Sequence, residues 1–268
     1  MSAPARRSVL ITGASAGIGE AFARAYARRG WDLILTARRR ERLEALADVL
    51  TPSGVKAHVV PADLGADDGA DRLLAALRSQ GLSPDGLVNN AGYSRTSGFL
   101  ASEWADHDAM IRVMLTAPVK LAHGLAPAMV ERGYGRIVNV ASLAGTMPAT
   151  GGDTLYGPIK SFLIKASQGL HLELRDRGVH VTALCPGYTY SEFHDVNGSR
   201  EEVSAAYPRW MWMTAEAVVE AGIEGVEANR PRVIPGLANR LLSGLAQHLP
   251  NGMALRMVGG HARRLKRL

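Results

Sequence analysis

Residues 12–30 read TGASAGIGEAFARAYARRG, with glycines at positions 13, 17 and 19. An apolar run, residues 8–11, comes directly before this stretch, so the glycines fall between a predicted strand and a predicted helix. A glycine-rich turn at such a junction lets backbone N–H groups approach a phosphate, and the start of the helix adds positive potential. The spacing differs from the common G-x-G-x-x-G fingerprint. Taken alone, it predicts either a nucleotide site or a tight turn that binds nothing.

Outward from this junction, predicted strands and helices alternate along the chain. Apolar runs typical of strands buried on both faces occupy residues 8–13, 32–37, 56–62, 86–92, 135–142, 180–187 and 232–236. Helical patterns occupy residues 17–29, 41–50, 67–79, 103–132, 154–177 and 214–228. This alternation predicts an α/β protein with a parallel sheet and helices on both of its faces.

The chain shows no internal repeat, linker or change in composition, which predicts a single domain. We expect a flexible N-terminal tail at residues 1–7, the domain at residues 8–250 and a basic C-terminal extension at residues 251–268. Within the domain, a substrate lid is expected around residues 188–213.

Composition excludes several classes of protein. The chain has 268 residues, of which 47% are hydrophobic and 21% charged, as in ordinary globular domains. Cys185 is the one cysteine, so no disulfide forms within the chain and a cytoplasmic location is expected. We expect no secretory signal and no transmembrane helix. Histidines 107, 123 and 171 lie in helical segments without a Cys/His cluster, so no metal site is expected.

The net charge of +6 resides at the two ends of the chain. Four cations at residues 263–267, together with Arg6 and Arg7, account for it, and neither terminal segment contains an acid. The body between them is near neutral, which argues against a nucleic-acid partner. The C-terminal HARRLKRL is either a solvated end or a weak peripheral contact for an anionic membrane.

The second predicted strand bears on the choice of nucleotide. In dinucleotide-binding folds an acid at the end of this strand binds the ribose 2′-OH of NAD, whereas an arginine accommodates the 2′-phosphate of NADP. Here the strand ends at Ala37 and three arginines follow, while Asp32 lies at its other end. This favours NADP over NAD, with Arg38, nearest the strand tip, as the expected phosphate contact. Arg40 is expected to be part of a charged helix start.

Tyr156 and Lys160 lie four residues apart in the predicted helix that begins DTLYGPIKSFL, so they share one face. A free tyrosine has a pKa near 10, and a nearby ammonium group favours the phenolate. Such a pair predicts a group that exchanges protons with a substrate. Taken alone, however, a Y-x-x-x-K pair is usually an ordinary helix face.

In order and spacing, the motifs of this chain resemble those of the short-chain dehydrogenase/reductase family. The match runs from about Ser8 to at least Phe193, and its motifs are TGASAGIG, Asp63 in ADL, NNAG at residues 89–92, Ser142 in NVAS, Tyr156 with Lys160, and CPGYT at residues 185–189. The resemblance implies a Rossmann-like, doubly wound parallel sheet of about seven strands in the order 3-2-1-4-5-6-7. It also implies a cofactor across the carboxyl ends of the strands and a dimer or tetramer formed through the two long helices.

The same resemblance implies roles for individual residues. Tyr156 would be the general acid/base, Lys160 would lower its pKa and bind the nicotinamide ribose, and Ser142 would position the substrate oxygen. The remaining cofactor contacts that it implies are Gly13, Ser15, Gly17, Ile18, Gly19, Asp63, Leu64, Asn89, Ala91, Gly92, Pro186, Gly187 and Thr189.

Two positions depart from the family pattern. Met114 stands in the long fourth helix where the family carries an asparagine that holds a water of a proton relay, and a thioether cannot donate a hydrogen bond. Pro158 lies between Tyr156 and Lys160, and proline is tolerated only in the first turn of a helix. We therefore expect Asp153 or Thr154 to cap this helix.

Residues 188–213 are rich in aromatic and methionine side chains, which suit an apolar pocket or the packing of a lid. Tyr93 and Ser94 are further pocket candidates. The sequence thus predicts an NADP(H)-dependent carbonyl reductase or alcohol dehydrogenase that acts on a small hydrophobic substrate. Two alternatives stay open: a regulator that binds NADP(H) without turnover, and an isomerase, dehydratase or epimerase on the same fold.

Overall fold

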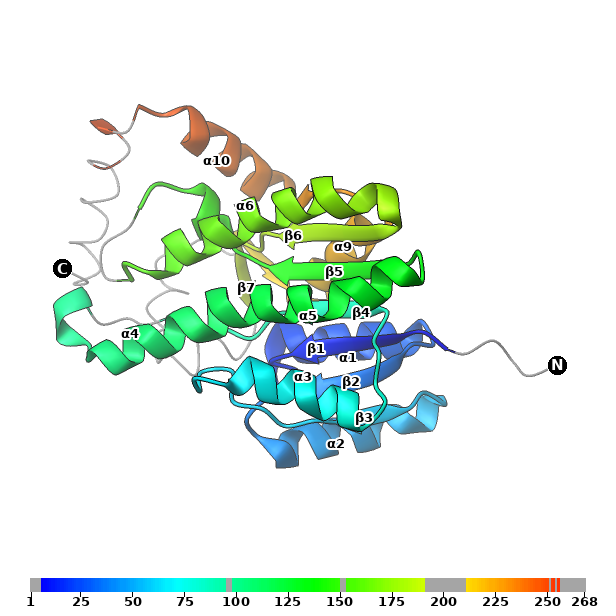
Figure 1. The fold of residues 1–268 in the computed structure, drawn as a ribbon. Coiled ribbons are helices and arrows are strands. Elements are labelled where there is room, and N and C mark those ends of the chain that lie inside the picture. Colours follow the sequence, from blue (N-terminus) through cyan, green and yellow to red (C-terminus); the bar gives the residue numbers. More distant parts are fainter. Residues whose placement is uncertain are drawn as a thin grey trace.

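The computed structural model describes residues 6–94, 98–149, 153–190, 211–250, 252–253 and 255. A parallel sheet of seven strands lies at the centre, in the order β3-β2-β1-β4-β5-β6-β9 (Figure 1). The expected order and the expected single domain are thereby confirmed. The strands of the sheet are β1 (Ser8–Thr12), β2 (Asp32–Thr36), β3 (Ala57–Val59), β4 (Gly86–Asn89), β5 (Gly135–Val140), β6 (Val179–Leu184) and β9 (Arg232–Val233).

Two layers of helices enclose the sheet (Figure 1). One face packs against α1 (Gly17–Arg28), α2 (Arg40–Leu50) and α9 (Ala215–Glu227). The other packs against α3 (Gly69–Ser79), α5 (Ala117–Glu131) and α6 (Tyr156–Leu174).

Successive strand residues belong to opposite cores. Val9 and Ile11 lie in the core under α1, whereas Leu10 between them lies in the core under α3. Because side chains alternate along a strand and both faces are covered, β1 reads as a nearly continuous apolar run. All six pairings of the sheet are parallel, so the carboxyl ends of the strands meet at one edge. That edge carries the candidate site.

The fourth helical segment is one run of 28 residues, Trp104–Glu131. It consists of α4 (Trp104–Ile111), a π turn (Arg112–Thr116) and α5. Among the described residues it is the one helix long and apolar enough to cross a membrane, with a mean hydropathy of 1.3. A core helix has the same composition, and Leu121, Leu125 and Met129 of this run lie in the core beneath α5. The cytoplasmic location stays a prediction.

A second, two-stranded parallel sheet was not expected from the sequence. It pairs β7 (Tyr188–Tyr190) with β8 (Trp212–Thr214). The rings of Tyr190 and Trp212 stack with their centroids 4.9 Å apart. This small sheet therefore joins the two ends of the segment predicted as a lid. Most of that segment, residues 191–210, lies outside the described residues, as do residues 1–5 and 256–268 of the predicted tails.

The chain continues past β9 into α10 (Leu237–His248), a helix that the sequence patterns did not predict. Gly236 precedes it with φ +83°, a left-handed conformation that favours glycine. The short helices are η1 (Thr51–Ser53), η2 (Phe99–Ala101), η4 (Leu143–Thr146) and η5 (Arg175–Arg177).

Candidate active site

The glycine-rich turn between β1 and α1 depends on its glycines. Gly13 and Gly17 have positive φ values of +67° and +57°. A Cβ at Gly13 would lie 2.9 Å from the Cα of Ala91, and one at Gly19 would overlap the carbonyl oxygen of Gly13. Ala16 is the N-cap of helix α1, and its side chain cannot accept a hydrogen bond from the first N–H groups of the helix. This arrangement suits an anion at the start of α1.

Two side chains that sequence reasoning missed attach this turn to β4. The Thr12 hydroxyl accepts hydrogen bonds from the backbone N–H groups of Asn90 (2.9 Å) and Ala91 (3.0 Å) and donates to the Val88 carbonyl (3.2 Å). In return, the Asn90 amide donates to the carbonyls of Thr12 (3.0 Å) and Gly13 (3.3 Å). The second Asn of NNAG was the available signal. These bonds fix the turn against the neighbouring strand.

The arginines after β2 lie beside the same turn. The Arg39 guanidinium donates to the Ser15 hydroxyl at 3.1 Å, and the Ala14 N–H donates to the Thr36 carbonyl at 3.2 Å. Arg38, the residue expected at the phosphate, is exposed, and its role stays a prediction. Arg40 pairs with a carboxylate on its own helix, as expected of a charged helix start. Arg39 is therefore a second candidate for a phosphate contact.

Four of the implied cofactor contacts, Asp63, Leu64, Asn89 and Ala91, lie in the loop after β3 and at the end of β4. The Asp63 carboxylate accepts a hydrogen bond from the Gly65 N–H at 2.9 Å, which orders the loop after β3. Leu64 is buried in the core under α3, and Ala91 packs against the same cluster. The Asn89 amide donates to the Asn139 side chain at 2.8 Å and so ties β4 to β5.

The turn after β6 approaches the same edge. The Pro186 carbonyl accepts from the Leu143 N–H at 2.8 Å, and the Thr189 hydroxyl donates to the Gly187 carbonyl at 3.0 Å. A Cβ at Gly187 would lie 2.6 Å from the side-chain amide of Asn239, so α10 packs directly on this turn. The contact from α10 was not anticipated, because the helix itself was not.

Ser142, Tyr156 and Lys160 converge at the carboxyl ends of β5 and β6. The side chains of Ser142 and Tyr156 are hydrogen-bonded. The Lys160 ammonium lies 5.6 Å from the centre of the Tyr156 ring and donates to the Val140 carbonyl at 2.8 Å. Gly145 makes the convergence possible, because a Cβ there would lie 2.6 Å from the Lys160 backbone.

Helix α6 begins at Tyr156 itself. Pro158 therefore sits in the first turn, where its missing N–H breaks no helical hydrogen bond. The expectation that Asp153 or Thr154 caps the helix is wrong. Leu155 occupies the N-cap in a helical conformation, with no side-chain cap.

Burial dominates the protonation of this pair. It raises the pKa of Tyr156 to about 12, although the hydrogen bond from Ser142 acts in the opposite direction. Burial also lowers the pKa of Lys160 to about 8. The expectation that the pKa of the phenol is lowered is not met, because desolvation of the phenolate raises it and the charge of Asp153 acts in the same direction.

Met114 fills the space beside Lys160. It lies in the π turn, is buried, and packs with Met110 and Ile159 in a cluster that Tyr156 also contacts. A Cβ on Gly92 would lie 2.8 Å from the Met114 sulfur and 3.7 Å from the Lys160 nitrogen. The Met114 thioether and the Lys160 ammonium group therefore both lie close to Gly92. Such π turns are frequent at functional sites.

Other sites on the predicted list lie around these. Gly17 opens α1, Ile18 packs on the core under α1, and Ser15 carries the contact to Arg39. In the described part of the chain, no group of three His, Cys, Asp or Glu side chains is placed to hold a metal ion.

Sequence comparison decides the family. A family profile described as short chain dehydrogenase matches residues 7–202. The chain belongs to the short-chain dehydrogenase family. It is therefore a member of a family of oxidoreductases, and the positions that resemble the family's motifs are the ones that converge at the carboxyl edge of its sheet.

Known relatives agree with this. The chain is 38% identical over 221 residues to a sulfoacetaldehyde reductase from Chromohalobacter salexigens, a match that covers 79% of this chain and 85% of the relative. A solved short-chain dehydrogenase from Sphingobium yanoikuyae, in complex with NADPH, is 34% identical with a TM-score of 0.78, covering 91% of this chain and 96% of that one. The bulky-bulky ketone specific alcohol dehydrogenase of Comamonas testosteroni is 30% identical with a TM-score of 0.74, covering 91% and 95%.

The residues present fit a dinucleotide. The start of α1, which has no side-chain cap, accepts a pyrophosphate, and Arg39 adds a cation on the Ser15 side of the turn. The hydrogen-bonded Ser142 and Tyr156, with Lys160 beside them, lie along the same edge at the end of β5. This spread along one edge matches the two ends of a dinucleotide bound across parallel strands.

Proposed function

We propose that this protein is an NADP(H)-dependent oxidoreductase that interconverts a ketone or aldehyde with an alcohol. The hydrogen bond between Ser142 and Tyr156, with Lys160 beside the phenol, is the observation that supports it most. The NADPH complex of the Sphingobium relative supports the cofactor, and the names of the reductase and alcohol dehydrogenase relatives support the reaction class.

The cofactor is held by the residues of the carboxyl edge. Its pyrophosphate lies on the turn that contains Gly13, Gly17 and Gly19, and its 2′-phosphate is bound by Arg38 and Arg39. Asp63 and Leu64 would face the adenine, Asn89 would brace the central strands, and Gly92 would leave room for the cofactor. Pro186, Gly187 and Thr189 would line the nicotinamide side. When bound, the reduced nicotinamide supplies the hydride that reaches the carbonyl carbon.

The chain's own residues manage the proton. With a pKa of about 12, the Tyr156 phenol keeps its proton at neutral pH. It donates this proton to the carbonyl oxygen as negative charge develops there. Ser142 donates a hydrogen bond that holds the same oxygen, and the Lys160 cation stabilises the phenolate left behind. The pair therefore suits reduction at neutral pH.

The substrate is a small, hydrophobic carbonyl compound. Tyr93 and Leu155 pack against the same buried cluster as Tyr156, and Tyr188 lies against Trp212 at the base of the proposed lid. Aromatic and aliphatic walls of this kind suit an apolar substrate. The Comamonas relative, specific for bulky-bulky ketones, lends support to this class. The lid expected around residues 188–213 stays a prediction, since most of it lies outside the described residues.

A carbonyl panel with NADPH and with NADH tests the proposal. Tyr156→Phe should lower turnover by about 10² to 10⁴-fold, since general acid catalysis contributes that much. The matched control is Tyr134→Phe. It removes the same hydroxyl from a residue next to the start of β5, at the opposite edge of the sheet, and should leave turnover unchanged.

Each outcome of the panel has a meaning. NADPH oxidation by wild type and Tyr156→Phe at equal rates would refute the acid role. NADPH binding without consumption across the whole panel would point to a regulator instead. Conversion of a substrate without net change in cofactor would point to an isomerase or dehydratase.

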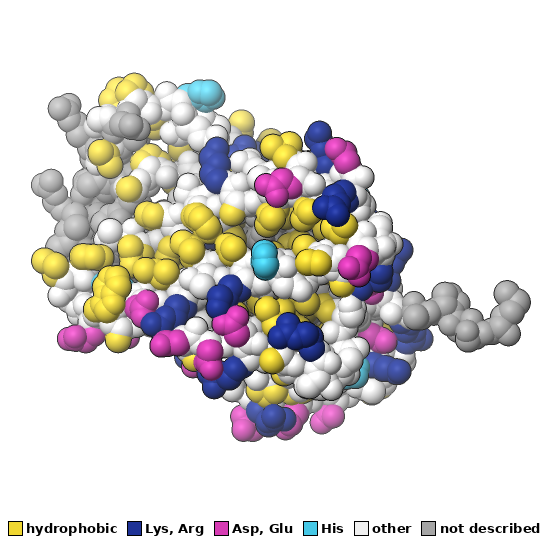
Figure 2. Space-filling view, viewed as in Figure 1, with side chains coloured by type: hydrophobic (Ala, Val, Ile, Leu, Met, Phe, Trp, Pro, Cys, Tyr) yellow, Lys and Arg dark blue, Asp and Glu magenta, His cyan; other side chains and the backbone are white. Residues whose placement is uncertain are grey.

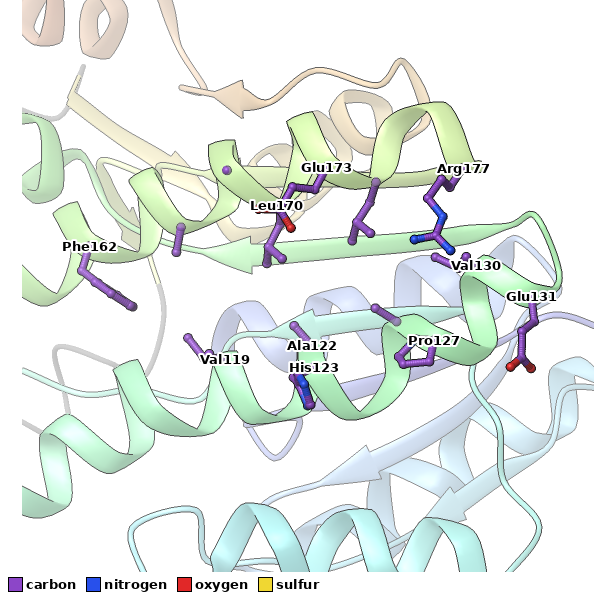
Figure 3. A pocket seen from close by; sticks show the side chains of 14 residues that line it. Val119, Ala122, His123, Pro127, Val130, Glu131, Phe162, Leu170, Glu173 and Arg177 are labelled. Atoms are coloured by element: carbon purple, nitrogen blue, oxygen red, sulfur yellow. The ribbon is translucent and has the colours of Figure 1, made fainter.

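The long helices α5 and α6 carry the proposed interface with a second copy. An apolar groove of 690 Å³ runs between them (Figure 3). Small and apolar residues form most of its lining, Glu131 and Arg177 lie toward one end, and His123 and Glu173 lie nearer its middle. We place a homodimer here, with each copy's helices covering the groove of the other.

A further inference from the structure

The helix α10 presents its apolar face outward. Leu237, Leu241 and Leu245 are 69%, 61% and 68% exposed, and their spacing of four residues puts them in one stripe. The polar Asn239 and Ser243 face inward and are 3% and 1% exposed. A surface helix of a globular protein normally shows the opposite arrangement. Figure 2 shows hydrophobic side chains along the outer side of this end of the molecule.

The charge of this part of the chain is entirely positive. From Ala228 to Leu268 the sequence contains no Asp or Glu. The same stretch contains eight cations: Arg230, Arg232, Arg240, Arg256, Arg263, Arg264, Lys266 and Arg267. Within α10, Arg240 and His248 are exposed and flank the leucine stripe. The apolar stripe thus lies in the most basic part of the sequence.

We propose that α10 and the basic C-terminal segment dock the protein on an anionic lipid surface. The three leucines enter the interfacial layer, and Arg240 keeps its guanidinium at the headgroups while its stem lies along the apolar face. The cations of residues 256–267 supply the second, electrostatic attraction that stable peripheral binding needs. This proposal does not depend on the proposed carbonyl chemistry.

Charge and polarity select lipid over the other occupants. Nucleic acid would bind the cations but gives no reason for an exposed leucine stripe. A second copy pairing through the same face would bring two acid-free, basic segments together, which opposes association. An anionic bilayer satisfies both the stripe and the charges.

The position of α10 links docking to the site. Asn239 packs on Gly187, in the turn beside the proposed nicotinamide site, so the inner face of α10 lies on that turn. Docking through the outer face of α10 therefore places lipid against a helix that contacts the proposed site on its other side.

Co-sedimentation of the full chain with vesicles tests the proposal. The probes are vesicles of phosphatidylcholine alone and of phosphatidylcholine with phosphatidylglycerol. We expect binding to the anionic vesicles to be about tenfold stronger, and to weaken about fivefold or more when salt is raised, since salt screens the attraction. Failure of wild type to prefer the anionic vesicles would overturn the proposal.

Two leucine variants show whether vesicle binding depends on the leucine stripe of α10 or on any exposed leucine. Leu241→Glu should weaken binding to the anionic vesicles by about tenfold, because it places an acid in the stripe. The matched control is Leu172→Glu on α6, since Leu172 is 63% exposed against 61% for Leu241. It should bind like wild type. Thermal melting shows whether each variant is folded.

A charge variant keeps the test decisive if Leu241→Glu does not fold. Arg263→Glu with Arg264→Glu should also weaken anionic binding about tenfold and leave melting unchanged. Equal binding by wild type, Leu241→Glu and the arginine double variant would overturn the proposal. So would a change in oligomeric mass caused by Leu241→Glu without vesicles, because the stripe would then be a contact between copies.

Discussion

At the scale of single residues, burial shifts the pKa values of Tyr156 and Lys160 in opposite directions. Tyr156 avoids the anionic form and Lys160 avoids the cationic form, because both are removed from water. Sequence reasoning predicted that the two groups meet but expected the wrong sign for the shift of the phenol. Spacing along a helix indicates which side chains are neighbours, whereas burial depends on everything packed around them.

The raised pKa of Tyr156 predicts the pH dependence of the two directions. Reduction needs the protonated phenol, which is present at all pH values below its pKa of about 12. Oxidation of the alcohol needs the phenolate, whose share grows with rising pH. We therefore expect reduction to be nearly flat from about pH 6 to 8 and oxidation to rise about tenfold per unit over that range. Initial rates in both directions measure this, and an oxidation rate independent of pH would contradict it.

Lys160→Met should stabilise the protein without bound cofactor while abolishing turnover. The pKa of Lys160 is about 8 in the fold and near its ordinary value when unfolded, so the buried cation costs on the order of 3 kcal/mol at pH 7. Removing the buried cation therefore stabilises the fold, but losing the hydrogen bond to Val140 offsets about 1 kcal/mol of this stabilisation. The net effect should raise Tm by roughly 5 °C.

The sign of the Lys160→Met effect follows from the two protonation states. Below pH 8 wild type carries the buried charge, and from pH 8 to 10.5 the folded chain loses its proton before the unfolded chain does. The advantage of the variant should therefore shrink as pH rises through that window. If the stability gain of Lys160→Met stayed constant from pH 7 to 10, the buried charge of Lys160 would not be its cause.

Met114→Asn tests the departure from the family's proton relay. An amide beside Lys160 can hold the water that a thioether cannot, so turnover should rise or stay unchanged. Placing that amide in the apolar cluster with Met110 and Ile159 should cost about 1–3 kcal/mol of stability. Steady-state turnover and thermal melting report the two effects. A tenfold fall in turnover with the fold intact would count against the alignment of the relay.

At the scale of elements, buried strands were the easiest to predict and short contacts between loops the hardest. The strand β1 and the helix α1 match their predicted ranges to within a residue, because their apolar patterns are unbroken. The pairing of β7 with β8 was missed, since three-residue strands leave almost no pattern. The helix α10 was also missed, although its leucines recur at the spacing of one helix face. That this face points outward could not be predicted from the spacing alone.

Asn90→Ala should loosen the glycine-rich turn. It removes the two hydrogen bonds from the Asn90 amide to Thr12 and Gly13, each worth about 1 kcal/mol. We expect NADPH to bind about tenfold more weakly, with a smaller change in turnover at saturation. Fluorescence titration with NADPH measures the affinity. Unchanged affinity would show that the turn keeps its shape without this side chain.

At the scale of the whole molecule, the sheet order and the two cores were predictable because parallel strands covered on both faces constrain topology strongly. The convergence of Ser142, Tyr156 and Lys160 was predicted from motif order. The sequence favours Arg38 over Arg39 as the phosphate contact because Arg38 is nearer in sequence to the end of β2. The geometry adds a contact of Arg39 with Ser15 that sequence proximity does not reveal.

Gly169→Arg tests the proposed homodimer. No atom lies within 4 Å of a Cβ placed on Gly169, so the variant should fold, yet its side chain would fill the groove between α5 and α6. We expect the wild type to sediment as a dimer or larger and Gly169→Arg as a monomer. Leu172→Arg adds the same charge to α6 outside the groove and should keep the wild-type mass. Identical masses for all three would contradict the interface.

The pairing of β7 with β8 has a practical consequence for engineering. Tyr188 and Thr214 bound a stretch whose two ends are fixed side by side by the backbone ladder and by the stacking of Tyr190 on Trp212. Because the two strands are parallel, residues 191–211 leave at one end of this three-residue ladder and return at the other, so a transplant from a relative has two fixed attachment points a short distance apart. Substrate range should thus be exchangeable among relatives by swapping this one cassette, while the nucleotide cleft and the proton-handling residues remain those of the host.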